Sequence, residues 1–246
     1  MNGSNPVVWR DHDAVLFDLD GVLTPTAEVH MRAWAEMFDA FLVGHDDPAA
    51  DTSPYSDGDY FAHVDGKPRY DGVRDFLQSR GIHLPEGDPS DPADAETVCG
   101  LGNRKNEASN AVLERDGVTP FPGSVALLDA LRDLGMPLAV VSSSANAPAV
   151  LAAAGLEGRF VTVVDGRVAH ELGLPGKPAP DTFVHAATAG GTTPARSVVV
   201  EDAVSGVRAG ATGGFGLVIG VDRGAGSEVL TEAGAHVVVT DLGELA

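Results

Sequence analysis

Short apolar runs alternate with helix-patterned segments along much of the chain. Five runs rich in Val, Leu, Ile and Phe have the length of buried strands; they span residues 13–18, 137–142, 197–201, 215–221 and 236–240. Apolar residues at helical spacing lie between them, at residues 125–134, 147–154, 181–189 and 203–211. Because strands that are apolar on both faces need helices on both sides, this alternation predicts a doubly wound, Rossmann-like parallel sheet of the α/β class.

The alternation fails between residues 26 and 116. Helix-patterned segments at 27–42, 72–80 and 97–116 flank an acidic stretch, residues 44–60, and no buried strand is evident. Prolines at both junctions, Pro25, Pro120 and Pro122, disfavour continuous helix there. The sequence therefore predicts an α/β core domain of residues 1–25 and 117–246 and an inserted all-helical domain of residues 26–116. The acidic stretch is predicted to be a solvated loop.

The amino-acid composition limits the classes of partner that this protein is expected to bind. The 246 residues include 16 Lys+Arg and 36 Asp+Glu, a formal charge of −20. Nucleic-acid backbones and anionic membrane surfaces are bound by clustered basic residues, so neither partner is expected. A single cysteine, Cys99, excludes an intramolecular disulfide, and neither a membrane-length apolar run nor a signal-peptide pattern is present. We expect a cytoplasmic monomer that acts on a small molecule.

Polar groups follow several of the predicted strands. The carboxyl ends of parallel strands converge on the ligand in this fold class, so these groups are expected to meet. They are Asp18 and Asp20 after the first run, Ser142, Ser143, Ser144 and Asn146 after the second, Lys177 ahead of a helix near residue 180, and Glu201 and Asp202 after the third. Carboxylates suit Mg²⁺ beside a phosphoryl group, and a lysine can neutralise the charge that develops on phosphoryl oxygens. A carboxylate can also be the nucleophile.

Each of these features has an ordinary structural explanation when it is taken singly. An Asp-x-Asp pair is commonly a turn, and a serine cluster is commonly a loop. Their joint occurrence at successive strand ends favours phosphoryl transfer. A zinc enzyme is not favoured, because the eight histidines are scattered and no HxxxH or CxxC spacing occurs. The serines also lack the GxSxG context of a triad nucleophile.

Seven segments resemble the motifs of a known family. FDLDGVLT at 17–24, VVSSS at 140–144, GKPAPD at 176–181 and VVVEDAVSGVRAG at 198–210 resemble the four motifs of the haloacid dehalogenase superfamily of phosphotransferases, in order. TAEVHMRAW at 26–34, GKPRYDGV at 66–73 and LGNRKNEA at 101–108 resemble the helical-cap motifs of the β-phosphoglucomutase family. The resemblance covers nearly the whole chain and identifies residues 26–116 as a cap domain.

The resemblance implies roles for residues of the core. Asp18 would be the nucleophile that becomes an aspartyl-phosphate, and Asp20 the general acid/base. Mg²⁺ would be held by Asp18, the backbone carbonyl of Asp20, Glu201 and Asp202. Further residues would bind the phosphoryl group in transfer: Ser142, Lys177 and, mainly through its backbone amide, Ser143.

It also implies roles for residues of the cap. His30 would orient Asp20 and the substrate, although an ordinary helix histidine is the alternative. Trp34 and Lys105 would close over the sugar, with a place in the cap core as the alternative for Trp34. Arg69 would bind the phosphate that is not transferred, opposite Ser144 and Asn146, because its planar fork can bind two oxygens.

The function implied is that of a β-phosphoglucomutase, which interconverts β-D-glucose 1-phosphate and glucose 6-phosphate through a sugar bisphosphate. A sugar-phosphate phosphatase of the same family is the alternative. This chain departs from the family pattern at Pro25, where β-phosphoglucomutases typically have Asp, and at Ala145, where some members have a lysine. Loss of that lysine weakens the expected binding of a bisphosphate and so favours a phosphatase. A non-catalytic sensor on this fold is a third possibility. Retention of Asp18, Asp20, Lys177 and Asp202 argues against it.

Overall fold

The computed structural model describes residues 7–246. Contacts divide the chain into an α/β unit, Met1–Pro25 with Val118–Ala246, and a helical unit, Thr26–Gly117. The domain boundaries predicted from the sequence remain a proposal. Within the described residues, no helix combines the length and the apolarity that a membrane crossing requires.

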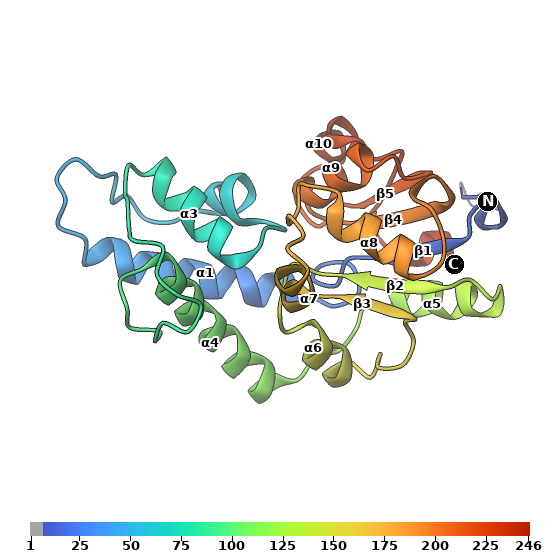
Figure 1. Cartoon of the computed structure of the whole chain (residues 1–246), viewed down its shortest axis with the longest axis horizontal. Coiled ribbons are helices and arrows are strands. Elements are labelled where there is room, and N and C mark those ends of the chain that lie inside the picture. Colours follow the sequence, from blue (N-terminus) through green and yellow to red (C-terminus); the bar gives the residue numbers. More distant parts are fainter. Residues whose placement is uncertain (1–6) are drawn as a thin grey trace. The chain divides into compact units, whose positions relative to one another are not determined.

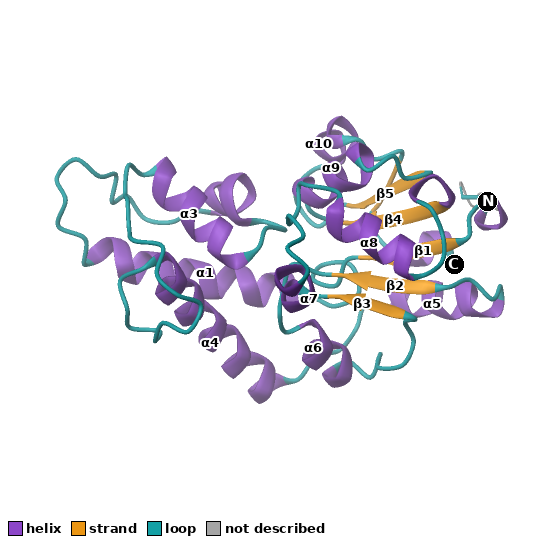
Figure 2. Cartoon of the chain, viewed as in Figure 1, coloured by secondary structure: helices purple, strands orange, loops and turns teal. Residues whose placement is uncertain are grey.

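The α/β unit is built on a six-stranded sheet in the order β3-β2-β1-β4-β5-β6 (Figures 1 and 2). Every neighbouring pair is parallel. The strands are β1 Ala14–Phe17, β2 Leu138–Val141, β3 Thr162–Val164, β4 Ser197–Glu201, β5 Leu217–Val221 and β6 Val237–Val239. The doubly wound α/β fold predicted from the sequence is confirmed. β3 was not predicted, because this three-residue edge strand has only one buried residue and gives a weak apolar signal.

Helices cover the sheet because its strands are apolar on both faces. On β1, Leu16 belongs to a core cluster that includes Phe183 and Val207 from helices, while Val15 and Phe17, which point to the opposite face, are equally buried. The helices are α5 Pro122–Asp133, α6 Ala147–Ala153, α7 Gly166–Glu171, α8 Asp181–Ala189, α9 Val204–Thr212 and α10 Ser227–Ala233. α7 and α10, each of which spans two turns or fewer, were not predicted from the sequence.

The chain order reverses between β1 and β4. From β1 the sheet grows to β2 and β3 on one side, and the chain then returns to place β4, β5 and β6 on the other. In open parallel sheets ligands bind at such a reversal, beyond the carboxyl ends of the strands. The loops after β1, β2 and β4 are therefore the candidates for a functional site.

The helical unit consists of three longer helices around an aromatic core. They are α1 Thr26–Val43, α3 Arg69–Ser79 and α4 Val98–Asp116, with a short helix α2 Asp57–Asp59 and a π-helical turn Tyr60–Val64. Trp34, Phe38 and Phe41 on α1 are spaced to form one apolar face, and all three are buried. The centroid of the Phe38 ring lies 4.0 Å from the centroid of the Phe76 ring and 5.2 Å from that of the Tyr55 ring.

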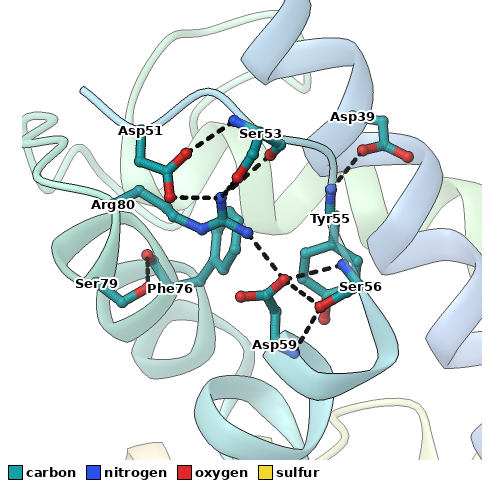
Figure 3. Close-up of polar contacts among 9 residues, drawn as sticks. All are labelled: Asp39, Asp51, Ser53, Tyr55, Ser56, Asp59, Phe76, Ser79 and Arg80. Carbon is teal, nitrogen blue, oxygen red and sulfur yellow. Dashed lines mark hydrogen bonds and ion pairs between the residues drawn. The ribbon is translucent and has the colours of Figure 1, made fainter.

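Figure 3 shows how the acidic stretch is attached to the helical unit. Arg80 is only 8% exposed, and its Nη2 lies 2.8 Å from Asp59 Oδ2 while Nη1 lies 3.1 Å from Asp51 Oδ2. Nη1 also donates to the Ser53 carbonyl at 3.2 Å, and the guanidinium lies 5.1 Å from the Phe76 ring centroid. The stretch is largely exposed, as predicted, but its last residues, 57–60, are helical and not loop. The buried arginine also fixes the stretch at three points that the sequence did not indicate.

We expect Arg80→Met to lower the free energy of unfolding by about 2 kcal/mol or more, because it leaves the largely buried Asp59 carboxylate without its charge partner. Burial alone would raise the pKa of Asp59, but hydrogen bonds from Ser56 and the charge of Arg80 hold it below its ordinary value of 3.8. The stabilisation is therefore present above that value and is lost as the pH falls through the lowered pKa.

Urea unfolding of wild type and variant at pH 7 and pH 3 measures both effects. Arg115→Met, which removes an exposed pair with Asp116, is the control and should change stability little. An Arg80→Met protein as stable as wild type at pH 7 would contradict this account.

Candidate active site

Three carboxylates gather at the carboxyl ends of β1 and β4. These strands are adjacent and in register, with Phe17 opposite Val200, so the residues that follow lie side by side. One oxygen from each of Asp18, Glu201 and Asp202 lies within 4.8 Å of the others. Asp18 and Glu201 are buried and Asp202 is half-buried. Carboxylate oxygens are the ligands that hard divalent cations prefer. Because buried negative charges need a compensating positive charge, this cluster fits such a cation.

Lys177 lies between two of these carboxylates. Its Nζ contacts Asp18 Oδ1 and Glu201 Oε1 and donates to the Val141 carbonyl at 3.1 Å. Burial alone would lower the pKa of Lys177, but the two carboxylates raise it, so the ammonium stays charged. Burial raises the pKa of Asp18, Lys177 opposes this, and Glu201 adds to it. A bound divalent cation would favour the ionised Asp18 again.

At two positions beside this cluster only glycine fits, because a side chain there would clash with a carboxylate. A Cβ on Gly206, in α9, would lie 1.8 Å from Glu201 Oε1, and a Cβ on Gly21 would lie 1.9 Å from Asp202 Oδ2. Glu201 Oε2 accepts a hydrogen bond from the Ala203 backbone at 2.9 Å, so both of its oxygens have partners. Sequence reasoning did not include these glycines in the site, although both stand inside the motifs that supplied the carboxylates.

Asp20 stands in a tight turn after β1. It forms an isolated β-bridge with Thr24, and the Gly21 amide donates to the Thr24 carbonyl at 2.7 Å. Gly21 has φ of +86°, a conformation that other residues rarely adopt. The backbone thus reverses directly after Asp20, which remains half-buried.

The serine-rich loop after β2 is held by its own side chains. Ser142 Oγ accepts from the Ser144 amide at 3.1 Å, and Ser144 Oγ accepts from the Asn146 amide at 3.2 Å. A Cβ on Gly166 would lie 2.7 Å from the Ser143 carbonyl oxygen, so the start of α7 closely supports the loop. Of these side chains Ser142 is buried, whereas Ser143, Ser144 and Asn146 are half-buried.

In the helical unit, His30, Trp34 and Lys105 form one cluster. Lys105 Nζ lies 2.7 Å from His30 Nδ1 and 5.0 Å from the Trp34 ring centroid. Ser109 Oγ, which the sequence analysis missed, is 3.3 Å from the same His30 nitrogen. An ammonium can only donate, so Nδ1 is assigned as the acceptor and a neutral His30 carries its proton on Nε2. Trp34 also stacks on Phe38. Its ring therefore packs in the core of the unit and contacts Lys105 at the same time.

Arg69 is the first residue of α3. Its guanidinium lies 5.1 Å from the centroid of the Tyr70 ring, and the Tyr70 hydroxyl donates to Asn103 Oδ1 at 2.9 Å. Gly102 allows this packing, because a Cβ there would lie 2.7 Å from the Tyr70 ring. Tyr70, Gly102 and Asn103 lie in the cap-like segments at 66–73 and 101–108 and were not predicted as site residues from the sequence.

We expect Gly206→Ala to lower kcat/KM for a phosphate-ester substrate by about 100-fold, because the added methyl group displaces Glu201 and with it Lys177. Steady-state kinetics and thermal melting of the purified variant measure the effect. Gly44→Ala is the control, since its Cβ would have no neighbour nearer than 3.7 Å. A Gly206→Ala enzyme with wild-type kcat/KM would show that the contact between Gly206 and Glu201 is unimportant.

Comparisons with known proteins agree with the geometry. A family model described as haloacid dehalogenase-like hydrolase matches residues 12–214. The β-phosphoglucomutase of Mycobacterium tuberculosis (strain CDC 1551 / Oshkosh) is 50% identical over 238 residues, which cover 94% of this chain and 90% of that protein. The β-phosphoglucomutase of Bacillus subtilis is 30% identical, covering 86% and 84% of the two chains. The fold is similar to that of the Clostridium difficile β-phosphoglucomutase, with a TM-score of 0.76 at 22% identity, covering 96% of this chain and 93% of that one.

Proposed function

Because the chain belongs to the haloacid dehalogenase-like hydrolase family, we propose that it is a Mg²⁺-dependent β-phosphoglucomutase that interconverts β-D-glucose 1-phosphate and glucose 6-phosphate. The observation that carries the proposal is the 50% identity to the mycobacterial β-phosphoglucomutase over 94% of the chain. The buried cluster of Asp18, Lys177 and Glu201 supports the same chemistry. We further propose that the enzyme is a monomer and that it is cytoplasmic, a reducing compartment in which the free thiol of Cys99 would persist.

In the proposed reaction Asp18 is the nucleophile. One of its oxygens attacks the phosphorus of the sugar phosphate, and the bond between phosphorus and the sugar oxygen breaks. The electron pair of that bond goes to the sugar oxygen, which takes a proton from Asp20. In the reverse sense, Asp20 removes the proton from a sugar hydroxyl that attacks the aspartyl-phosphate. Transfer to the 6-hydroxyl of glucose 1-phosphate gives the bisphosphate, and return of its 1-phosphoryl to Asp18 leaves glucose 6-phosphate.

Several residues stabilise the phosphoryl group in transit. Lys177 is charged and already in contact with Asp18, so it can neutralise charge on the phosphoryl oxygens without moving far. Ser142 and the Ser143 amide would donate to the same group. A divalent cation held by Asp18, Glu201, Asp202 and the Asp20 carbonyl would supply further charge neutralisation, and Mg²⁺ is the ion we propose.

The helical unit would recognise the rest of the substrate. Arg69, with Ser144 and Asn146, would bind the phosphate that is not transferred. His30, with its proton on Nε2, would act as a hydrogen-bond donor toward Asp20 or a substrate oxygen rather than as a base. Lys105 orients that imidazole and, with Trp34, would contact the sugar.

The phosphatase alternative differs only in the acceptor of the phosphoryl group. Water would attack the aspartyl-phosphate in place of a sugar hydroxyl. Ala145, which stands where some family members have a lysine, favours this alternative because the missing cation weakens the expected binding of a bisphosphate.

Phosphorus NMR separates the two activities. With β-glucose 1-phosphate, Mg²⁺ and a trace of glucose 1,6-bisphosphate, we expect the substrate signal to be replaced by that of glucose 6-phosphate, with little free phosphate. Prompt release of phosphate without glucose 6-phosphate would overturn the mutase assignment and favour the phosphatase.

The reaction should stop in excess chelator and resume when Mg²⁺ is restored. Unchanged turnover in chelator would contradict the proposed cofactor.

We expect Asp18→Asn to abolish both glucose 6-phosphate formation and phosphate release, because a neutral amide is not a competent nucleophile toward phosphorus. The same NMR assay and a colorimetric phosphate assay measure the two products. Asp13→Asn, which changes an exposed carboxylate paired with Arg196, is the matched control and should retain activity. Turnover by Asp18→Asn would refute the assigned nucleophile.

A further inference from the structure

The turn that follows β1 carries both proposed catalytic carboxylates, and it is closed by its own backbone. The Leu23 and Thr24 amides donate to the Leu19 carbonyl at 2.9 and 3.1 Å, and the Gly21 amide donates to the Thr24 carbonyl at 2.7 Å. The carbonyls of residues 21–23 lie outside these bonds. Since buried carbonyls need partners, contacts from elsewhere must complete this turn.

Those partners come from two distant segments of the α/β unit. At the start of α5, the Phe121 amide donates to the Leu23 carbonyl at 3.0 Å and Ser124 Oγ donates to the Val22 carbonyl at 2.7 Å. From the loop between β5 and α10, Arg223 Nε donates to the Gly21 carbonyl at 2.8 Å. Arg223 therefore binds the residue directly after Asp20.

Arg223 is itself fixed by two more contacts. Its Nη1 donates to the Thr240 carbonyl at 3.0 Å, after β6, and its guanidinium carbon lies 4.0 Å from the centroid of the Phe121 ring. A planar guanidinium can donate in two directions while it stacks on an aromatic face, which an ammonium cannot do. The side chain thus joins the catalytic turn to the start of α5 and to the end of the sheet.

The position of Gly21 matters because the turn has almost no free space. A Cβ at residue 21 would lie 1.9 Å from Asp202 Oδ2, so the backbone there rests directly on a carboxylate of the acidic cluster. A shift of the Gly21 carbonyl would move the adjacent Asp20 and disturb Asp202. A misplacement of about 1 Å in a reacting group can cost about 100-fold in rate.

We infer that Arg223 is a positioning residue for Asp20: by holding the Gly21 carbonyl, it sets where the proposed general acid stands relative to Asp18 and Asp202. The inference rests on the proposed function, because it takes Asp20 as the group that protonates the sugar oxygen. It assigns Arg223 no contact with the substrate.

The test compares two phosphoryl donors whose leaving groups differ in their need for a proton. A sugar oxygen leaves as a strong base and needs the acid, whereas acetate leaves from acetyl phosphate without one. With β-glucose 1-phosphate, Arg223→Met should lower kcat about 30- to 100-fold with KM within about threefold of wild type. In a single turnover, phosphorylation of Asp18 by acetyl phosphate, followed as acetate release, should fall less than about fivefold, because no step before acetate leaves needs Asp20.

Two further variants make the result interpretable. Arg223→Lys retains the charge and one donor, so it should fold normally and lose an intermediate amount of kcat on the sugar phosphate. Arg196→Met removes an exposed arginine that pairs with Asp13, and it should match wild type on both donors. Thermal melting confirms that each variant is folded.

Two outcomes would overturn the inference. One is a kcat on the sugar phosphate within threefold of wild type in Arg223→Met. The other is an equal fall on both donors, which would indicate general damage to the site rather than misplacement of the acid. A wild-type enzyme that releases phosphate but makes no glucose 6-phosphate would defeat the mutase proposal while leaving this comparison intact.

Discussion

The ammonium of Lys177 between the Asp18 and Glu201 carboxylates is the interaction on which the rest of the α/β unit's site depends. Each of these charges would be costly to bury alone, and each is tolerated because the others are in contact with it. With Asp202 included, the cluster has more carboxylates than cations. That excess makes the cluster suitable for a divalent cation, which would also offset the repulsion between the carboxylates and an anionic substrate.

The same interaction explains local sequence choices that otherwise look unrelated. Glu201 fits only because residue 206 has no side chain, and Asp202 fits only because residue 21 has none. The parallel pairing of β1 with β4 places residues 18 and 201 next to one another, and β2 supplies the carbonyl that Lys177 also contacts. The glycine positions and the register of β1 with β4 are thus both needed to bring the charged groups of this cluster into contact.

Much of the fold and of the chemistry could be predicted from the sequence, because both have local signatures. Apolar runs marked five of the six strands of the described sheet, and polar residues directly after those runs marked the carboxylates. Lys177 was recognised from its GKPAPD segment ahead of a helix. What could not be predicted depends on distant contacts. The buried Arg80 looks like any helix-end arginine until residues 51 and 59 fold back on it, and Arg223 lies 202 positions from the glycine it binds.

The three lysines show how an acidic protein can use cations for an anionic substrate. The chain has a net charge of −20, so its overall field repels a sugar phosphate and attraction must come from individual groups. Lys67 is paired with Asp75, and Lys177 is shared by two carboxylates. Lys105 contacts the imidazole of His30 and lies over the ring of Trp34. The three lysines therefore contribute positive charge at individual positions and do not form a basic surface, so any attraction for an anionic substrate has to be local.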